Sequence, residues 1–94
     1  MPSYIALVHK DPDSDYGVSF PDLPGCITAG LDLEDARRMA SEALGLHLAG
    51  MSADGDDIPE PSTLEMIMAD PVNHDGRPIV VEAMPMPLNL FEVQ

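Results

Sequence analysis

The sequence predicts a small α+β domain, in which an antiparallel three-stranded meander and a further C-terminal strand form a sheet with helices on one face. Three observations predict this class. Short apolar runs separated by turn residues fill the first thirty positions, one long amphipathic stretch follows, and a β-branched run comes near the end. The 94 residues of the chain suffice for one compact domain with a modest core.

The first three strands follow one another closely. Ser3–His9 is a compact apolar run, and the polar cluster KDPDSD ends it, because Pro12 has no N–H to donate to a neighbouring strand. Large apolar residues alternate with small ones along Tyr16–Phe20, as they do in a strand with one buried face. Cys26–Ala29 offers a third short strand after the turn PDLPG. The short separations predict an antiparallel meander.

A long helix follows, and its start is well marked. We expect Asp32 to be the N-cap, with Asp35 at the capping-box position and Glu34 adding negative charge to the first turn. The helix is expected to end near Ala53, where the glycine of ADGDD follows. One apolar stripe, flanked by Met39 and Leu46, contains Leu33, Ala36, Ala40, Ala43, Leu44, His47 and Met51. Its small residues indicate close packing on a sheet.

The second half predicts a short helix and a last strand. After the connector IPEPS, Ser62–Ala69 fits a short helix capped by Ser62, and the segment NHDGR is typical of a turn. Ile79–Ala83 is a β-branched run long enough for a buried strand. We therefore expect one domain over residues 1–84, followed by an apolar tail over residues 85–94.

The turn PDLPG raises the question of a site. Pro21 and Pro24 fix the backbone on both sides of the turn, and Gly25 can adopt a positive φ, so the segment predicts a rigid reversal between two strands. A phosphate cradle would instead open a helix. A nucleophilic Cys26 would need a positioned base and an electropositive setting, which the neighbouring sequence does not supply.

The charge balance favours a basic partner. Four Lys and Arg residues against 17 Asp and Glu give a formal net charge of −13, which repels nucleic acid phosphates and anionic lipid. A plainer reading is that the acidic surface keeps a small domain soluble. The sequence begins with no signal peptide, contains one cysteine and has no apolar run long enough to span a bilayer, so we expect a cytoplasmic protein with no membrane partner.

YGVSFPDLPGCITAG, followed by LDLEDARRMASEALGLHLAGMSADGDDIPEPS, resembles the HicB antitoxin family. The likeness covers Tyr4 to Ser62 and consists of a P-D-hydrophobic-P-G turn, an acidic helix start, an E-A-L-x-L-H-L helix body and an I-P-x-P-S connector. The resemblance implies a partial RNase H-like fold with the order β-β-β-α-α-β. It also implies an antitoxin that neutralises a small basic mRNA-cleaving toxin of the HicA type by covering its RNA-binding surface.

On this reading the protein is not an enzyme, and we expect no catalytic residue, cofactor or metal. The residues expected to contact the toxin are Asp22, Leu23, Glu34 and Asp35. Two alternatives stay open: an orphan interaction domain without a toxin, and an RNase H-like metal-dependent nuclease. The nuclease is disfavoured because the first strand, Tyr4-Ile5-Ala6-Leu7-Val8, carries no carboxylate.

The resemblance also implies that many members carry a C-terminal DNA-binding module, and this sequence departs from them there. We expect the tail over 85–94 to be either an oligomerisation segment or a truncated linker to a missing DNA-binding domain. We expect no DNA binding by this chain alone, because its four basic residues are outnumbered by acids. We also expect a homodimer or higher even oligomer, because apolar strand edges tend to pair. The residues expected to form that contact are Ile79, Val80, Val81, Leu88, Leu90 and Phe91.

Overall fold

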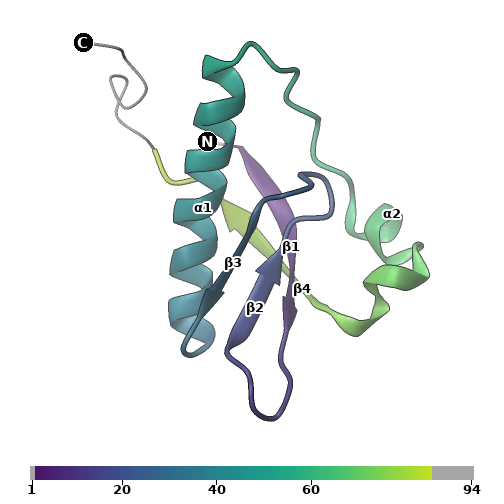
Figure 1. Ribbon diagram of the computed structural model, residues 1–94. Helices are drawn as coiled ribbons and strands as arrows, with labels where there is room; N and C mark the ends of the chain where they lie inside the picture. The colour runs from purple at the N-terminus through teal and green to yellow at the C-terminus, as the bar shows by residue number, and fades with distance from the viewer. Residues whose placement is uncertain (1, 86–94) are drawn as a thin grey trace.

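The structure, a computed structural model, describes residues 2–85 and has the α+β order that the sequence predicts (Figure 1). The strands are β1 (Ser3–His9), β2 (Tyr16–Ser19), β3 (Ile27–Gly30) and β4 (Arg77–Glu82). The helices are α1 (Leu33–Ala53), α2 (Leu64–Met68) and the 3₁₀ helix η1 (Pro71–Asp75). Of the predicted apolar tail, residues 86–94 lie outside the described residues.

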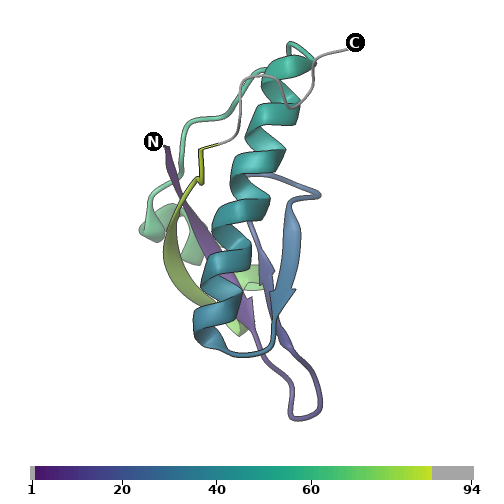
Figure 2. The same cartoon turned by 90° about the vertical axis from the view of Figure 1, so that its left-hand side faces the viewer.

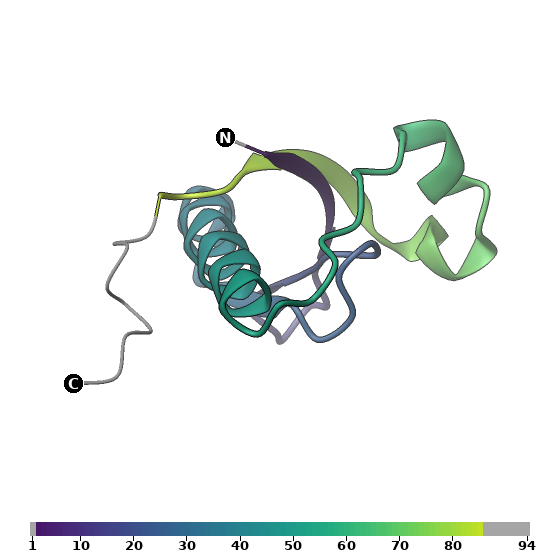
Figure 3. The same cartoon turned by 90° about the horizontal axis from the view of Figure 1, so that it is seen from above.

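The four strands form one antiparallel sheet in the order β3-β2-β1-β4. The meander is therefore confirmed, and the last strand returns to pair with the first. The β1–β4 ladder is the longest, running from Ser3 opposite Glu82 to Val8 opposite Arg77. Figure 3 shows that the sheet curves around α1, so that β3 and β4, the two edge strands, both lie close to the helix.

The main core lies between α1 and the concave face of the sheet (Figure 2). Its residues alternate along the strands, as they must when one face is buried. The members are Tyr4, Ala6, Val8, Val18, Phe20, Leu23, Cys26, Ala36, Ala40, Leu44, Leu48, Val81 and Ala83. Gly30 brings the end of β3 against the first turn of α1, where an added Cβ would lie 2.3 Å from the backbone nitrogen of Ala36. Only glycine fits this contact.

The buried stripe of α1 is rotated from the predicted one. Ala36, Ala40 and Leu44 are buried as expected, but Leu48 joins them, whereas Leu46 is 50% exposed. Leu46 lies beside the edge strand β3, where it lines an open hollow with Ile27 and Ala43 and no further strand covers it. Leu33, placed on the predicted stripe, is also partly exposed, at 36%.

The short helix α2 lies on the convex side of the sheet, although the sequence analysis placed both helices on one face. Figure 3 shows α1 inside the curve and α2 outside it. Leu64 of α2 lines a small apolar hollow together with Ile5 and Val80, whose side chains point away from α1. The cap of α2 is Thr63, whose side chain accepts a hydrogen bond from the Met66 N–H, and not Ser62 as predicted.

The first turn of α1 is stabilised by its cap. The Asp32 carboxylate accepts a hydrogen bond from the Asp35 N–H at 2.7 Å, and the Asp35 carboxylate accepts one from the Leu31 N–H at 2.9 Å. We expect Asp32→Ala to lower the free energy of unfolding by about 1 kcal/mol, because it leaves a helix N–H without its acceptor. Urea denaturation measures the loss. Asp13→Ala, in the β1–β2 loop, removes the same charge, and equal losses in both variants would contradict the capping role.

Candidate functional site

The turn between β2 and β3 is tightly hydrogen-bonded. The Leu23 N–H donates to the Phe20 carbonyl at 3.0 Å, and the Cys26 N–H donates to the Leu23 carbonyl at 3.0 Å. Gly25 has φ of +91°, which lies in the left-handed region that side chains other than hydrogen disfavour. Leu23 was expected to contact a partner, but it is 2% exposed and belongs to the core, so its side chain is not available for that contact. Its apolar character serves packing.

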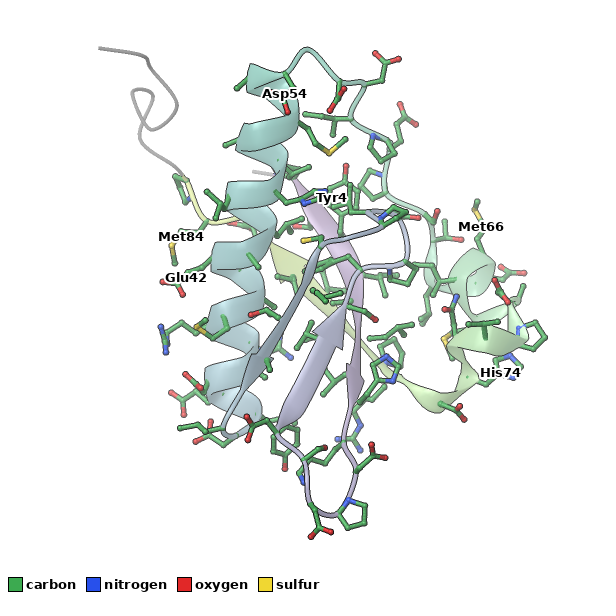
Figure 4. The ribbon with its side chains drawn as sticks, viewed as in Figure 1. Tyr4, Glu42, Asp54, Met66, His74 and Met84 are labelled. Carbon is green, nitrogen blue, oxygen red and sulfur yellow. The ribbon has the colours of Figure 1, made fainter. Side chains whose placement is uncertain are left out.

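Asp22 holds the connector that leads to α2. One carboxylate oxygen accepts the Ser62 N–H at 2.7 Å, and the other accepts the Ser62 hydroxyl at 2.7 Å. Nearby, the Tyr4 hydroxyl donates to the Pro59 carbonyl; Figure 4 shows Tyr4 on β1 beside the connector. Burial, with the charges of Asp22 and Glu60, raises the pKa of Tyr4, which keeps that hydroxyl protonated. These hydrogen bonds attach the connector to β1 and to the β2–β3 turn, and we call them the latch. Both carboxylate oxygens of Asp22 take part in it.

The acidic start of α1 contains the other two residues expected to bind a toxin. Asp35 forms an ion pair with Arg38 at 2.5 Å. The hydrogen bond from the Leu31 N–H is the largest cause that lowers the pKa of Asp35, and the hydrogen bond and charge of Arg38 lower it further. Glu34 is exposed and makes no hydrogen bond or ion pair within residues 2–85. Asp32, Glu34, Asp35 and Arg38 line an open hollow of about 290 Å³. Of the four predicted contact residues, Glu34 is the one left unengaged there.

The two edges of the sheet differ in how their outward backbone groups are satisfied. On β4, the carbonyl of Val80 accepts a hydrogen bond from Arg37 at 3.2 Å, and that of Glu82 accepts one from Ser41 at 2.7 Å. Pro78, at the next outward position, has no N–H. Side chains of α1 therefore cover much of the β4 edge. Such protection of an exposed edge opposes pairing with another strand.

The β3 edge carries no such cover. The Phe20 N–H donates to the Cys26 carbonyl, so the backbone C=O group of Cys26 points towards β2. Because a strand's backbone groups alternate in direction, Ile27 and Ala29 turn their N–H and C=O groups away from β2. No hydrogen bond to these groups occurs within the described part of the chain. The side chain of Ile27 is 71% exposed.

A groove runs along α1 beside the β3 edge. It comprises two adjoining hollows of about 570 Å³ and about 210 Å³, which share Leu46 and His47. The remaining lining residues are Pro24, Gly25, Cys26, Ile27, Ala43, Gly50, Met51, Asp54 and Asp56. Sequence reasoning placed Leu46 beside the core, although its position at the margin of the stripe could have indicated a surface role.

Cys26 lies at the floor of this groove and is not reactive. It is 3% exposed, and burial raises the pKa of its thiol to about 11. Its sulfur contacts the carbonyl oxygen of Ala43 at 3.8 Å. At neutral pH the thiol is therefore protonated, which is the inert form of cysteine.

Two further histidines make contacts within the fold. His9 contacts the Ser19 hydroxyl at 3.3 Å, and His74 contacts the Met68 carbonyl at 2.8 Å. Among residues 2–85, no group of three or more His, Cys, Asp and Glu side chains could hold a metal ion. No helix in that part of the chain is long and apolar enough to cross a membrane.

The residues expected to join two copies differ in how far they are exposed. Val81 is 2% exposed and packs in the core, so its side chain is not available to a second copy, which corrects the sequence analysis. Val80 is 64% exposed, and Ile79 packs partly against the core. Leu88, Leu90 and Phe91 lie outside the described residues. The homo-oligomer therefore stays a prediction, as does the lack of DNA binding.

The latch predicts that Asp22 stabilises the fold. Asp22→Ala removes both carboxylate oxygens that accept from Ser62 and leaves its N–H and hydroxyl without these acceptors, so we expect the free energy of unfolding to fall by about 1–3 kcal/mol. Urea denaturation measures this. Asp57→Ala makes the same substitution in the exposed connector and serves as the control. A loss no larger than that of the control would contradict the latch.

Burial of Cys26 predicts a decline in stability at alkaline pH. The unfolded thiol ionises near its ordinary value of 9.0 and the folded one near 11, so the unfolded state releases its proton first. The free energy of unfolding should therefore fall as pH rises from about 9 towards about 11. Cys26→Ala should decline less over that window, since the other titrating groups are common to both proteins. Parallel curves, measured by urea denaturation at several pH values, would overturn the assignment.

Comparison with known proteins identifies the family. Residues 4–90 match the family described as "HicB_like antitoxin of bacterial toxin-antitoxin system". An uncharacterized 14.9 kDa protein of Haemophilus phage HP1 is 37% identical over 67 residues, which are 71% of this chain and 50% of that protein. The crystal structure of the Burkholderia pseudomallei antitoxin HicB is 32% identical with a TM-score of 0.78, over 88% of this chain and 64% of that one.

A structure of a HicA3 and HicB3 toxin-antitoxin complex contains a chain that is 27% identical with a TM-score of 0.72. That match covers 88% of this chain and 99% of the other. The chain thus spans half the length of the phage protein and 64% of the Burkholderia antitoxin. With the family match extending over most of the sequence, the protein belongs to the HicB-like antitoxin family of bacterial toxin-antitoxin systems.

Proposed function

We propose that this chain binds a small, basic HicA-like RNase and neutralises it by covering the surface that binds RNA. The observation that carries this proposal is the similarity to a chain of the HicA3 and HicB3 complex, nearly all of which is matched. The match is to a complex of a toxin with an antitoxin, so the fold shared with this chain is one that occurs in such a pair. The proposed action is binding and not catalysis.

The surface charge supports the choice of partner. A protein that binds RNA needs positive charge on its binding face, and this chain presents a net charge of −13. Many of the acids are exposed, among them Glu34 in the first turn of α1 and Asp54 and Asp56 just after its last turn. Opposite charges speed the encounter of two such proteins and oppose the binding of RNA by the antitoxin itself.

An orphan interaction domain remains the second candidate, because it would share the fold and the acidic surface. The two are distinguished by whether the reading frame beside the gene encodes a small basic RNase that this chain inhibits. The nuclease alternative has no support in the described residues, where no metal-binding cluster is present and β1 carries no carboxylate.

The electrostatic part of the proposal predicts a strong salt dependence. The association rate constant with the adjacent-frame toxin should fall severalfold between about 0.1 M and about 1 M salt, because the Debye length shrinks from about 10 Å to about 3 Å. Stopped-flow mixing measures the rate, and cleavage of an RNA substrate measures inhibition. A rate that is independent of salt would contradict charge steering.

A charge variant tests which acids matter. The combined change Glu34→Gln, Asp54→Asn and Asp56→Asn should slow association, because it removes three exposed charges from the two ends of α1. The matched control, Glu60→Gln, Glu65→Gln and Asp75→Asn, removes three charges from the connector, α2 and η1. Equal slowing by the two variants would show that net charge alone, and not its placement, governs the encounter.

A further inference from the structure

We propose that the open edge of β3, together with the groove along α1, receives an extended segment of the partner, which adds to the sheet as a fifth strand. This inference rests on the proposed function for the identity of the partner, a basic toxin. It goes beyond that function by assigning the surface and the mode of binding.

The first argument is the difference between the two edges. Adding a strand requires outward backbone groups that have no other partner. On β4, Arg37 and Ser41 already donate to the outward carbonyls, and Pro78 has no N–H to offer. On β3, Ile27 and Ala29 present both N–H and C=O groups without a partner in the described residues. Strand addition is therefore directed to β3.

The second argument is the shape beside that edge. Side chains of an added strand would alternate, with one set pointing to the concave side of the sheet. There the hollow lined by Cys26, Ala43 and Leu46 lies directly next to β3. Leu46 is 50% exposed, so it offers an apolar contact that the fold itself does not use. An apolar side chain of the partner strand would bury it.

The third argument is charge, which selects the occupant. The groove has Asp54 and Asp56 near one end, and the acidic hollow with Glu34 lies at the start of α1, which follows β3 in the chain. An extended segment with an apolar centre and Lys or Arg on either side fits this pattern. A second copy of this chain would instead bring another net charge of −13 to the same edge.

Proline substitutions at the two edges test the inference. Ala29→Pro removes an outward N–H from β3 and leaves the β2 ladder intact, so we expect the Kd for the adjacent-frame toxin to rise about tenfold or more. Val80→Pro is the matched control, because Val80 holds the same outward position on β4. Its Kd should match that of the parent. Calorimetric titration measures both, and circular dichroism checks that each variant is folded.

A helix-surface variant tests the groove separately. Leu46→Gln should also weaken binding, whereas Val72→Gln, at an apolar residue of η1 that is 80% exposed, should not. Hydrogen exchange followed by NMR supplies a readout in the unmodified protein. On binding, the amide protons of Ile27 and Ala29 should become protected, and the outward amide of Val80 should not. This readout decides the question even if Ala29→Pro fails to fold.

The outcomes separate this inference from the proposed function. If the parent chain does not bind or inhibit the toxin, the proposed function fails and the strand-addition inference fails with it. If the parent inhibits the toxin while Ala29→Pro and Leu46→Gln bind equally well, or Ile27 and Ala29 gain no protection, only the inference fails. Protection of these amides in the free chain, with sedimentation as a dimer, would assign the edge to a second copy and also overturn it.

Discussion

The contact between α1 and the concave face of the sheet is the one on which the other features depend. Ala36 and Ala40 allow the helix to approach the strands closely, and Gly30 lets β3 reach the backbone of the first helical turn. Leu44, which is completely buried, fills the centre of the interface. Because the chain is short, this single layer of packing supplies most of the core, and the sheet must curve around the helix to complete it.

The curvature gives the two edges of the sheet different environments. Close to β4, α1 presents Arg37 and Ser41, whose side chains are long enough or polar enough to bond the outward carbonyls. On the β3 side the helix presents Leu46, whose side chain has no hydrogen-bond donor for the outward carbonyls, and a groove lies beside it. One helix thus protects one edge and leaves the other open. This asymmetry means that backbone groups on one edge of the sheet are satisfied within the chain, whereas those of Ile27 and Ala29 on the other edge have no partner in the described residues.

The acidic residues fall into two groups that composition alone does not distinguish. Asp22, Asp32 and Asp35 accept hydrogen bonds from backbone N–H groups, so they hold a connector or a helix start. Others, such as Glu34, Asp54 and Asp56, are exposed and contribute to the field outside the molecule. The side chains of the second group accept no backbone N–H within residues 2–85, so their charges are not tied to the stability of the fold.

The sequence by itself determined the order of the elements, the start and end of α1 and the family. These are local properties: the period of the apolar residues, the cap at Asp32 and the turn at Gly25 are set by neighbours along the chain. It did not determine that Asp22 bonds Ser62 or that Leu23 and Val81 are buried, because these facts join segments far apart in the sequence. The rotation of α1, which exposes Leu46 and buries Leu48, and the protection of β4 by Arg37 were likewise decided by the tertiary structure. A helical pattern fixes which residues share a face, but the curvature of the sheet decides how much of that face it covers.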